Sequence, residues 1–324
     1  MSKTPSTARA SSSAVDQLTL DALEGLRKTP KQLSPVWFYD EEGSCLFDSI
    51  CELPEYYLTR TESQIMTEHG AEMARCIGPH AALIEFGSGS SDKTRILLDK
   101  LESLACYVPI DISRDYLFET AGLLARDYPA LRITPVCADF TQPFDLPVHI
   151  AAAHRRVVYF PGSTLGNFET EAAQRVLTTM RTIIGRKGAV LIGIDLRKDP
   201  KVLQRAYNDA AGVTAEFNLN ALRHINRELG ADFDVDAFEH SALWIENQSR
   251  IEMHLISTRD QEIHLGDETV TIQKGEHVRT ECCHKYTLEG FATLATSADL
   301  AVTHVWTDPE RQFSVQMLAA KRSQ

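Results

Sequence analysis

The residues best suited to chemistry follow a short apolar segment, residues 82–86, which predicts a buried strand. Gly87-Ser88-Gly89 comes directly after this segment, and apolar residues at helical spacing begin at Thr94. Glycine lets a backbone approach a ligand closely because it has no Cβ. The helix that follows would aim unpaired N–H groups at that ligand. A nucleotide-like ligand suits this turn, although a tight strand-to-helix turn without a ligand has the same pattern.

Two further predicted strands end in an acidic residue. Residues 107–113 place Asp111 about twenty positions after the glycines, where a carboxylate can accept hydrogen bonds from both ribose hydroxyls of a nucleoside. Asp111 could instead cap the next helix, but the glycines before it favour the ribose role. Residues 131–140 end in Asp139-Phe140, a pair that predicts an acceptor for an adenine amino group beside an aromatic ring.

These side chains need a scaffold that collects the ends of several strands at one edge. Between residues 61 and 196 strand-like and helix-like segments alternate, and two more strands are expected at residues 156–160 and 188–196. Such alternation predicts a doubly wound α/β fold with a parallel sheet, whose ligands lie at the carboxyl ends of the strands. A glycine-rich loop, residues 161–168, follows the first of these two strands.

The end of the chain distinguishes two classes of nucleotide-binding enzyme. Residues 301–308 and 313–320 predict two strands joined by a short Asp-Pro turn, which make a terminal antiparallel hairpin. A nicotinamide-dependent oxidoreductase shares the Gly-x-Gly turn and the downstream acid, but it would continue with parallel units. Asp92 also stands where the third glycine of its fingerprint would be. The order of elements resembles instead the class I S-adenosylmethionine-dependent methyltransferases.

The segments outside this core predict a second, discontinuous domain of α+β type. Helical spacing after Asp195 gives way to strand-like alternation from residue 250 onward. The expected boundaries are a mobile tail at residues 1–14, a substrate-binding domain at 15–60 and 197–286, and a methyl-donor-binding core at 61–196 and 287–324.

Composition excludes several classes of function. Asp and Glu number 45 against 33 Lys and Arg, and a net charge of −12 opposes a protein that tracks nucleic-acid phosphates. No apolar stretch is long enough to span a bilayer. Seven cysteines without regular spacing indicate reduced thiols and a cytoplasmic protein. Cys282-Cys283 lacks the spacing of a Cys-x-x-Cys clamp, so we expect no metal. We expect a monomer that takes a small molecule.

With these residues assembled, the chain resembles the histidine-specific Nα-methyltransferases of ergothioneine biosynthesis, which convert L-histidine to its trimethyl betaine, hercynine. The resemblance extends from about Gln17 to Ala320. Several of the stretches that carry it are long and not general to methyltransferases. They are Trp37-Phe38-Tyr39-Asp40, Leu53-Pro54-Glu55-Tyr56-Tyr57, Glu85-Phe86-Gly87-Ser88-Gly89, Gly162-Ser163-Thr164-Leu165-Gly166-Asn167, residues 206–214 and Asn226-Arg227-Glu228-Leu229.

The resemblance implies S-adenosylmethionine as cofactor and assigns roles to individual positions. Residues expected to bind the methyl donor are Gly87, Gly89, Lys93, Asp111, Asp139 and Phe140. Residues expected to line the amino-acid pocket are Tyr56, Gly162, Asn167, Tyr207, Met253, Glu281 and Cys283.

Methyl transfer from a sulfonium mainly requires that the amine be held behind the methyl group at short distance. We therefore expect the amino acid to be fixed at both ends. Asn167 and Tyr207 would hold the α-carboxylate, and Tyr56 and Glu281 would fix the side chain. The carbonyl of Gly162 would orient the amine. Tyr39 is a further catalytic candidate, to orient the amine or relay its proton.

One position departs from the family pattern. Where the family reads Glu-x-Ser-x-Lys, this chain has Cys283 in place of the serine. In that family the Glu and Ser together hold the imidazole, and a thiol is a weaker hydrogen-bonding group than a hydroxyl. Glu281 keeps the stronger, charge-assisted bond to the ring. Histidine remains the expected substrate, and tyrosine, tryptophan or a partly methylated histidine are alternatives. A nicotinamide-dependent oxidoreductase and a non-catalytic ligand-binding protein are more distant ones.

Overall fold

The computed structural model describes residues 12–89, 91–151 and 153–321. The mobile tail predicted for residues 1–14 lies, up to residue 11, outside the described residues, and Ser12 already begins a helix, α1 (Ser12–Leu26). The chain divides into two compact units. Unit 1 holds the described residues up to Glu52, Gln204–Leu243 and Glu252–Glu281; unit 2 holds Leu53–Leu203, Trp244–Ile251 and the described residues from Cys282 onward.

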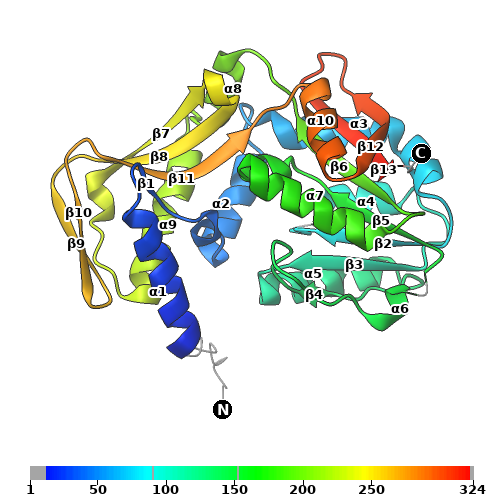
Figure 1. The fold of residues 1–324 in the computed structure, drawn as a ribbon, viewed down its shortest axis with the longest axis horizontal. Coiled ribbons are helices and arrows are strands. Elements are labelled where there is room, and N and C mark those ends of the chain that lie inside the picture. Colours follow the sequence, from blue (N-terminus) through cyan, green and yellow to red (C-terminus); the bar gives the residue numbers. More distant parts are fainter. Residues whose placement is uncertain (1–11, 90, 152, 322–324) are drawn as a thin grey trace. The chain divides into compact units, whose positions relative to one another are not determined.

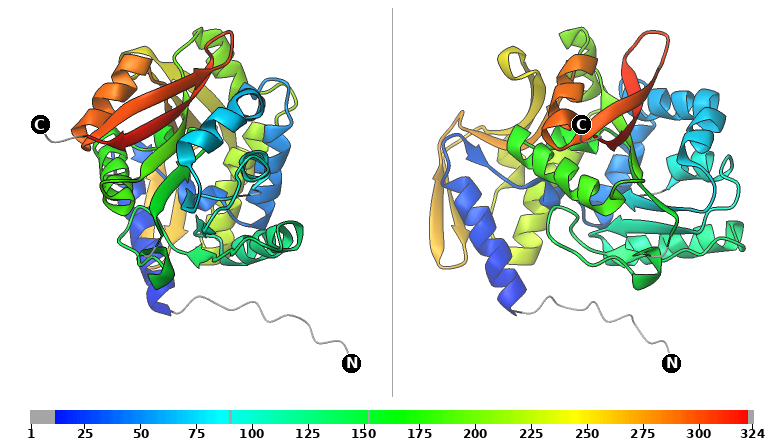
Figure 2. Two further views of the ribbon diagram at one scale, coloured as in Figure 1. Left: turned by 90° about the vertical axis from the view of Figure 1, so that its right-hand side faces the viewer. Right: turned by 45° about the vertical axis from the view of Figure 1, so that its right-hand side comes forward.

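Unit 2 is built on a seven-stranded sheet in the order β12-β13-β6-β5-β2-β3-β4, counted over the described residues. From β6 to β4 the neighbouring strands are parallel, whereas β13 runs antiparallel to both β6 and β12. Figure 2 shows the β12–β13 hairpin in red. This topology confirms the doubly wound sheet with a terminal hairpin. The strands are β2 (Ala81–Phe86), β3 (Cys106–Asp111), β4 (Val136–Cys137), β5 (Arg155–Phe160), β6 (Ala189–Asp195), β12 (Leu300–Thr307) and β13 (Phe313–Ala320).

Helices cover both faces of this sheet, and they can be followed in Figure 1. One core cluster joins alternate residues of the strands to α7 and α10. On the other face the α3 residues Ile65, Met66 and Met73 are fully buried, and the Tyr159 hydroxyl of β5 lies 3.1 Å from the Met66 sulfur. The helices are α3 (Tyr57–Ile77), α4 (Asp92–Leu98), α5 (Arg114–Asp127), α6 (Val148–Ala151), α7 (Thr170–Ile184), α8 (Pro200–Ala206, which runs into unit 1) and α10 (Leu288–Ser297).

Unit 1 combines a mixed sheet with helices. The sheet order is β1-β11-β8-β7, with β1 parallel to β11, and β9 pairs with β10 in a separate hairpin. Three of its strands, β7, β8 and β11, run on into unit 2. The remaining elements are β1 (Lys31–Gln32), η1 (Pro35–Phe38), α2 (Glu41–Cys51), α9 (Val213–Leu229), η3 (Val235–Ala237), β7 (Phe238–Ile245), β8 (Arg250–Ser257), β9 (Gln261–Leu265), β10 (Glu268–Ile272) and β11 (His277–His284).

Several expected elements differ from the structure. The strand expected over residues 131–140 is reduced to β4, because Pro135 has no N–H to donate to a ladder. The helical segment expected from 197 to 238 is broken into α8 and α9, and β7 is an addition. Unit boundaries fall at 52/53, 203/204, 243/244, 251/252 and 281/282, whereas the sequence placed domain boundaries at 60/61, 196/197 and 286/287. The substrate-binding role of unit 1 stays a prediction.

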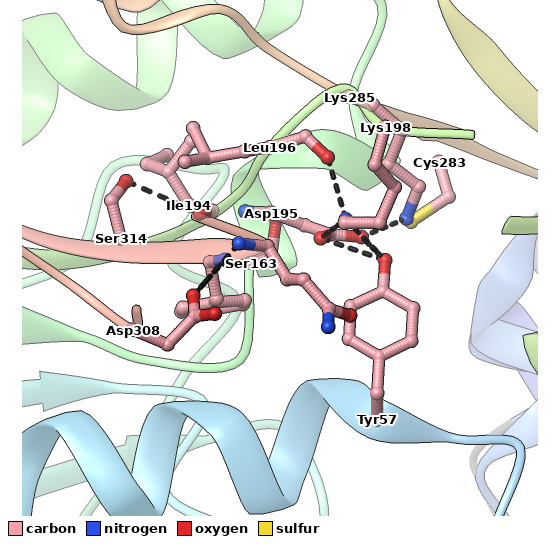
Figure 3. Close-up of polar contacts among 12 residues, drawn as sticks. Tyr57, Ser163, Ile194, Asp195, Leu196, Lys198, Cys283, Lys285, Asp308 and Ser314 are labelled. Atoms are coloured by element: carbon pink, nitrogen blue, oxygen red, sulfur yellow. Dashed lines mark hydrogen bonds and ion pairs between the residues drawn. The ribbon is translucent and has the colours of Figure 1, made fainter. Parts of the chain in front are cut away.

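At the end of β6 a fully buried carboxylate, Asp195, is surrounded by cationic and hydroxyl groups of unit 2 (Figure 3). The Tyr57 hydroxyl donates to both carboxylate oxygens at 2.8 and 2.7 Å, and the Lys285 ammonium lies 2.7 Å from Oδ2. Lys198 contacts both Asp195 and the Tyr57 hydroxyl. These contacts fasten β6 to the start of α3 and to the segment after β11.

Asp195 and Lys285 stay charged in spite of burial because each lies beside a group of opposite charge. Burial would raise the pKa of Asp195, but the charges of Lys285 and Lys198 outweigh it and hold the pKa below its ordinary value. Burial opposes the charged form of Lys285, yet Asp195 raises the pKa of Lys285 well above its ordinary value. For Lys198 burial dominates and lowers the pKa to about 8. The pair Asp195–Lys285 therefore carries the fixed charge.

We expect Asp195→Asn to lower the free energy of unfolding by about 3–5 kcal/mol, because it leaves the buried Lys285 ammonium without its carboxylate. Lys285→Met should cost less, since Asp195 would keep Lys198 and Tyr57. Urea unfolding followed by circular dichroism measures both variants. An Asp195→Asn midpoint equal to that of the wild type would contradict this assignment.

Candidate active site

The glycine turn after β2 has the backbone that a close ligand contact requires. Gly87 and Gly89 both have positive φ, at 68° and 48°. A Cβ at Gly89 would meet no described atom within 4 Å, so the turn opens away from the protein there. The Ser88 hydroxyl is buried and has no hydrogen-bond partner among the described residues. A buried hydroxyl normally has a partner, so this one fits a polar ligand group at the turn.

Asp111 lies at this turn, as the spacing predicts. Its Oδ1 accepts a 2.9 Å hydrogen bond from the Ser113 N–H, which fixes the carboxylate at the end of β3. Its Oδ2 faces the Gly89 N–H at 3.4 Å, a long contact that leaves this oxygen able to accept stronger hydrogen bonds. The geometry suits an acceptor for hydroxyl groups.

Asp139 and Phe140 follow β4 at the same edge. The Asp139 Oδ1 accepts hydrogen bonds from the backbone and hydroxyl of Thr141, at 2.8 and 2.6 Å. The Phe140 ring stacks on Phe86 with centroids 5.1 Å apart, and one of its edge carbons is 3.9 Å from where a Gly87 Cβ would be. Phe140 is therefore a fixed apolar wall beside the glycine turn.

Lys93 and Gly162 are joined by an acid that the sequence analysis missed, Glu62 of α3. Glu62 is almost fully buried, and its carboxylate lies 2.6 Å from the Lys93 ammonium. The same carboxylate accepts the Gly162 N–H, at 3.1 and 2.9 Å from its two oxygens. Gly193 of β6 makes room for it, since a Cβ there would lie 2.1 Å from Glu62 Oε1. One carboxylate thus connects the first turn of α4 to the loop that follows β5.

A second buried acid, Glu85, lies within β2 immediately before the turn. Its partners are the hydroxyl of Thr94, at 2.8 and 2.7 Å, and the hydroxyl of Tyr107. Burial raises the pKa of Glu85 to about 8, although these hydrogen bonds and Lys93 lower it in part. Glu85 is therefore mostly neutral at pH 7 and links β2 to α4 and β3 through hydroxyl groups.

The loop after β5 carries Asn167 and is fastened to the end of β11 within unit 2. This loop contains η2 (Thr164–Asn167). Cys282 Sγ contacts the Asn167 carbonyl at 3.6 Å, and His284 Nδ1 contacts the Gly166 carbonyl at 3.0 Å. A Cβ at Gly166 would lie 2.7 Å from the His284 carbonyl, so only glycine allows this approach. Cys283, between these two residues, accepts a hydrogen bond from Lys285 at 3.3 Å.

The other predicted amino-acid residues are distributed over both units. Tyr56 is buried in unit 2, directly before α3. In unit 1, Tyr39 is exposed and makes T-shaped ring contacts with Phe38, Phe47 and Phe217. Three more of the predicted amino-acid-binding residues, Tyr207, Met253 and Glu281, are buried in unit 1. The structure thus brings the predicted cofactor residues together in unit 2, whereas the predicted amino-acid residues come from two separate units.

Glu62 and Ser88 are the residues that sequence reasoning missed. Glu62 stands three and four positions before Ile65 and Met66, so it lies on the apolar stripe of α3. An acid on an apolar helical face is a signal for a buried partner, and it could have been recognised. Ser88 gave no such signal, because its lack of a partner is visible only in the fold.

Among the described residues, no three His, Cys, Asp or Glu side chains form a group that could hold a metal ion. None of the helices in the described ranges combines the length and the apolar character needed to cross a membrane.

Comparison with known proteins gives matches over at least 90% of this chain. A family model described as "Histidine-specific methyltransferase, SAM-dependent" matches residues 18–320. The histidine N-alpha-methyltransferase of Mycolicibacterium smegmatis is 42% identical over 313 residues, covering 95% of this chain and 96% of that protein. The histidine N-alpha-methyltransferase of Mycobacterium tuberculosis is 42% identical over 307 residues, covering 93% of this chain and 94% of that protein. Ergothioneine biosynthesis protein 1 of Neurospora crassa is 30% identical over 300 residues, covering 90% of this chain and 34% of that protein.

The raised pKa of Glu85 predicts a pH dependence of stability. Between its ordinary pKa of 4.5 and about 8, the folded protein binds a proton that the unfolded chain releases. The free energy of unfolding should therefore fall as the pH rises through this interval, by up to about 1.4 kcal/mol per pH unit from this group.

Glu85→Gln should remove the contribution of Glu85 to the fall in the free energy of unfolding with pH, because glutamine resembles the protonated acid and does not titrate. Urea unfolding at several pH values between about 5 and 9 compares the variant with the wild type. Identical pH dependence of the two proteins would mean that Glu85 is ionised in the fold.

Proposed function

Because the chain belongs to the family of histidine-specific, S-adenosylmethionine-dependent methyltransferases, we propose that it methylates the α-nitrogen of free L-histidine three times to give hercynine, as a step of ergothioneine biosynthesis. The observation that carries this proposal is the extent of the similarity: 42% identity over 95% of the chain to a histidine N-alpha-methyltransferase, with both units included. Similarity confined to unit 2 would have supported only a methyl-donor site.

The described residues fit S-adenosylmethionine. The positive-φ glycines, the Ser88 hydroxyl without a described partner and the Asp111 carboxylate suit a nucleoside with two hydroxyl groups. Asp139 and Phe140 suit an adenine ring, and Lys93 suits a carboxylate. When bound, the cofactor supplies a methyl group on a cationic sulfur, which needs little acid or base catalysis. The protein's task is to hold the acceptor amine.

For the amino acid we propose the contacts that the resemblance implies. Asn167 and Tyr207 hold the α-carboxylate, Tyr56 and Glu281 fix the side chain, and Met253 and Cys283 line the pocket. The Gly162 carbonyl accepts from the amine. Support for this last role comes from Glu62, which fixes the Gly162 peptide by accepting its N–H, so that the orientation of the loop is set before substrate binds.

The α-ammonium must lose a proton before each transfer. An α-amino group has a pKa near 8, so water can remove this proton without a strong base. We propose that Tyr39 orients the amine or relays its proton. The amine gains bulk with each transfer, and aromatic side chains tolerate the quaternary ammonium of the product.

Cys283 favours a second candidate function, methylation of another free amino acid such as tyrosine, tryptophan or a partly methylated histidine. In place of the family's serine it offers the ring a weaker hydrogen-bonding group. A screen of free amino acids with S-adenosylmethionine, with products identified by mass spectrometry, tests both candidates. Three methyl groups on histidine support the first function. Methylation of tyrosine or tryptophan without histidine would contradict it.

We also propose a monomeric, cytoplasmic enzyme whose substrate is a small molecule rather than nucleic acid or membrane. A net charge of −12 opposes binding to nucleic-acid phosphates and to anionic lipids. Size-exclusion chromatography with light scattering measures the oligomeric state, and a mass near twice 36.2 kDa would contradict the monomer.

Two alanine variants separate the two ligands. Asn167→Ala should raise the KM for histidine about tenfold to a hundredfold, the loss expected for a hydrogen bond to a charged group, with little change for S-adenosylmethionine. Asp111→Ala should do the reverse, because it removes the acceptor at the glycine turn. Steady-state kinetics with each substrate varied in turn measures both. Equal losses for both substrates in both variants would contradict the separate roles.

Cys283→Ser should lower the KM for histidine by a few-fold, because a hydroxyl forms a stronger hydrogen bond than a thiol. Steady-state kinetics at saturating S-adenosylmethionine measures this change. An unchanged KM for Cys283→Ser would mean that the thiol makes no hydrogen bond to the ring.

A further inference from the structure

We propose that Asn218 is a positioning residue that fixes three predicted substrate-binding residues, Tyr207, Met253 and Glu281, through one buried hydrogen-bond network in unit 1. This inference rests on the proposed function, because the three residues have their roles from it. The network itself consists only of contacts within unit 1.

Asn218 lies on α9 and is fully buried. Its Nδ2 donates to the His254 carbonyl at 3.1 Å and to His240 Nδ1 at 2.8 Å, and its Oδ1 accepts from the Thr280 hydroxyl at 2.7 Å. A backbone carbonyl can only accept, so the amide nitrogen must face His254. The orientation of the Asn218 amide is therefore determined by its surroundings.

This orientation determines the state of His240. Because Asn218 donates to Nδ1, the ring proton of His240 is on Nε2, which donates to the Tyr207 carbonyl at 2.8 Å. Burial lowers the pKa of His240, against smaller raising effects of the Tyr207 carbonyl and Asp209, so the ring stays neutral. His240 thus holds the peptide of Tyr207 in place.

The other end of the network reaches two adjacent strands. The Thr280 hydroxyl, on β11, lies 2.7 Å from Asn218 Oδ1 and 3.1 Å from the Met253 carbonyl on β8. Glu281 is the next residue along β11, and neighbouring side chains of a strand point to opposite faces. The Thr280 hydroxyl therefore forms its hydrogen bonds on the face of β11 toward α9. These bonds hold the backbone from which the Glu281 side chain extends on the opposite face.

A matched control is available on the same helix. The Asn226 side chain also makes two hydrogen bonds within unit 1, to the N–H and carbonyl of Phe233, at 2.9 and 2.8 Å. Neither of these two hydrogen bonds reaches a predicted substrate-binding residue. Asn226→Ala should therefore cost stability as Asn218→Ala does, without changing the pocket.

The test compares Thr280→Val, Thr280→Ser, Asn218→Ala and Asn226→Ala in steady-state kinetics, with thermal unfolding as a check on folding. Thr280→Val keeps the shape of the side chain and removes the hydroxyl. It should raise the KM for histidine about tenfold and leave the KM for S-adenosylmethionine within about twofold. Thr280→Ser keeps the hydroxyl and should have the wild-type KM for histidine. Asn218→Ala should raise this KM as Thr280→Val does. Asn226→Ala should leave it unchanged.

Two outcomes would overturn the inference alone: an unchanged histidine KM in Thr280→Val, or an equal rise in Asn226→Ala. A wild-type protein that does not methylate histidine would contradict the proposed function and this inference together. The two failures are distinguishable because the second is seen before any variant is made.

Discussion

The position of the loop after β5 relative to α4 depends on the buried carboxylate of Glu62. It accepts the Gly162 N–H of that loop and pairs with Lys93 in the first turn of α4, and it lies against β6 where Gly193 has no side chain. A buried carboxylate is costly without partners and strongly oriented with them. Lys93 and Gly162, which stand 69 positions apart, therefore have their relative positions fixed by a residue that needs to touch neither ligand.

Glu85 and Asp195 show how surroundings decide the charge of a buried acid. Glu85 has hydroxyl partners, which stabilise a carboxylate less than burial destabilises it, so its pKa rises to about 8. Asp195 has two ammonium groups within reach, and its pKa falls in spite of complete burial. Both acids end up as cross-links between β-strands and the elements next to them. The charge of Glu85 changes near pH 8, whereas Asp195 forms an ion pair that persists over the neutral range.

The predictions that succeeded from the sequence rest on local signals. Apolar runs followed by glycine or an acid identified β2 and β3, and the Asp-Pro turn identified the hairpin that Asp308 stabilises by accepting the N–H groups of Gln312 and Phe313. Pairings between distant residues have no local signal. The Glu62–Lys93 pair spans 31 positions, so the sequence shows each residue but not the contact. The position of β7 was missed because its residues do not alternate between apolar and polar.

The peptides to which we assign substrate contacts are held by interactions of different physical kinds in the two units. In unit 2 the Gly162 peptide is held by a carboxylate that also bears an ion pair, so its position depends on charge. In unit 1 the peptides of Tyr207 and Met253 are held by a neutral amide, a neutral imidazole and a hydroxyl. The ring and carboxylate of an amino acid are unchanged through three methylations, whereas its amine grows and becomes permanently cationic. Under the proposed function, the neutral network of unit 1 supports residues assigned to the unchanged parts, and none of its groups gains or loses charge as the amine does.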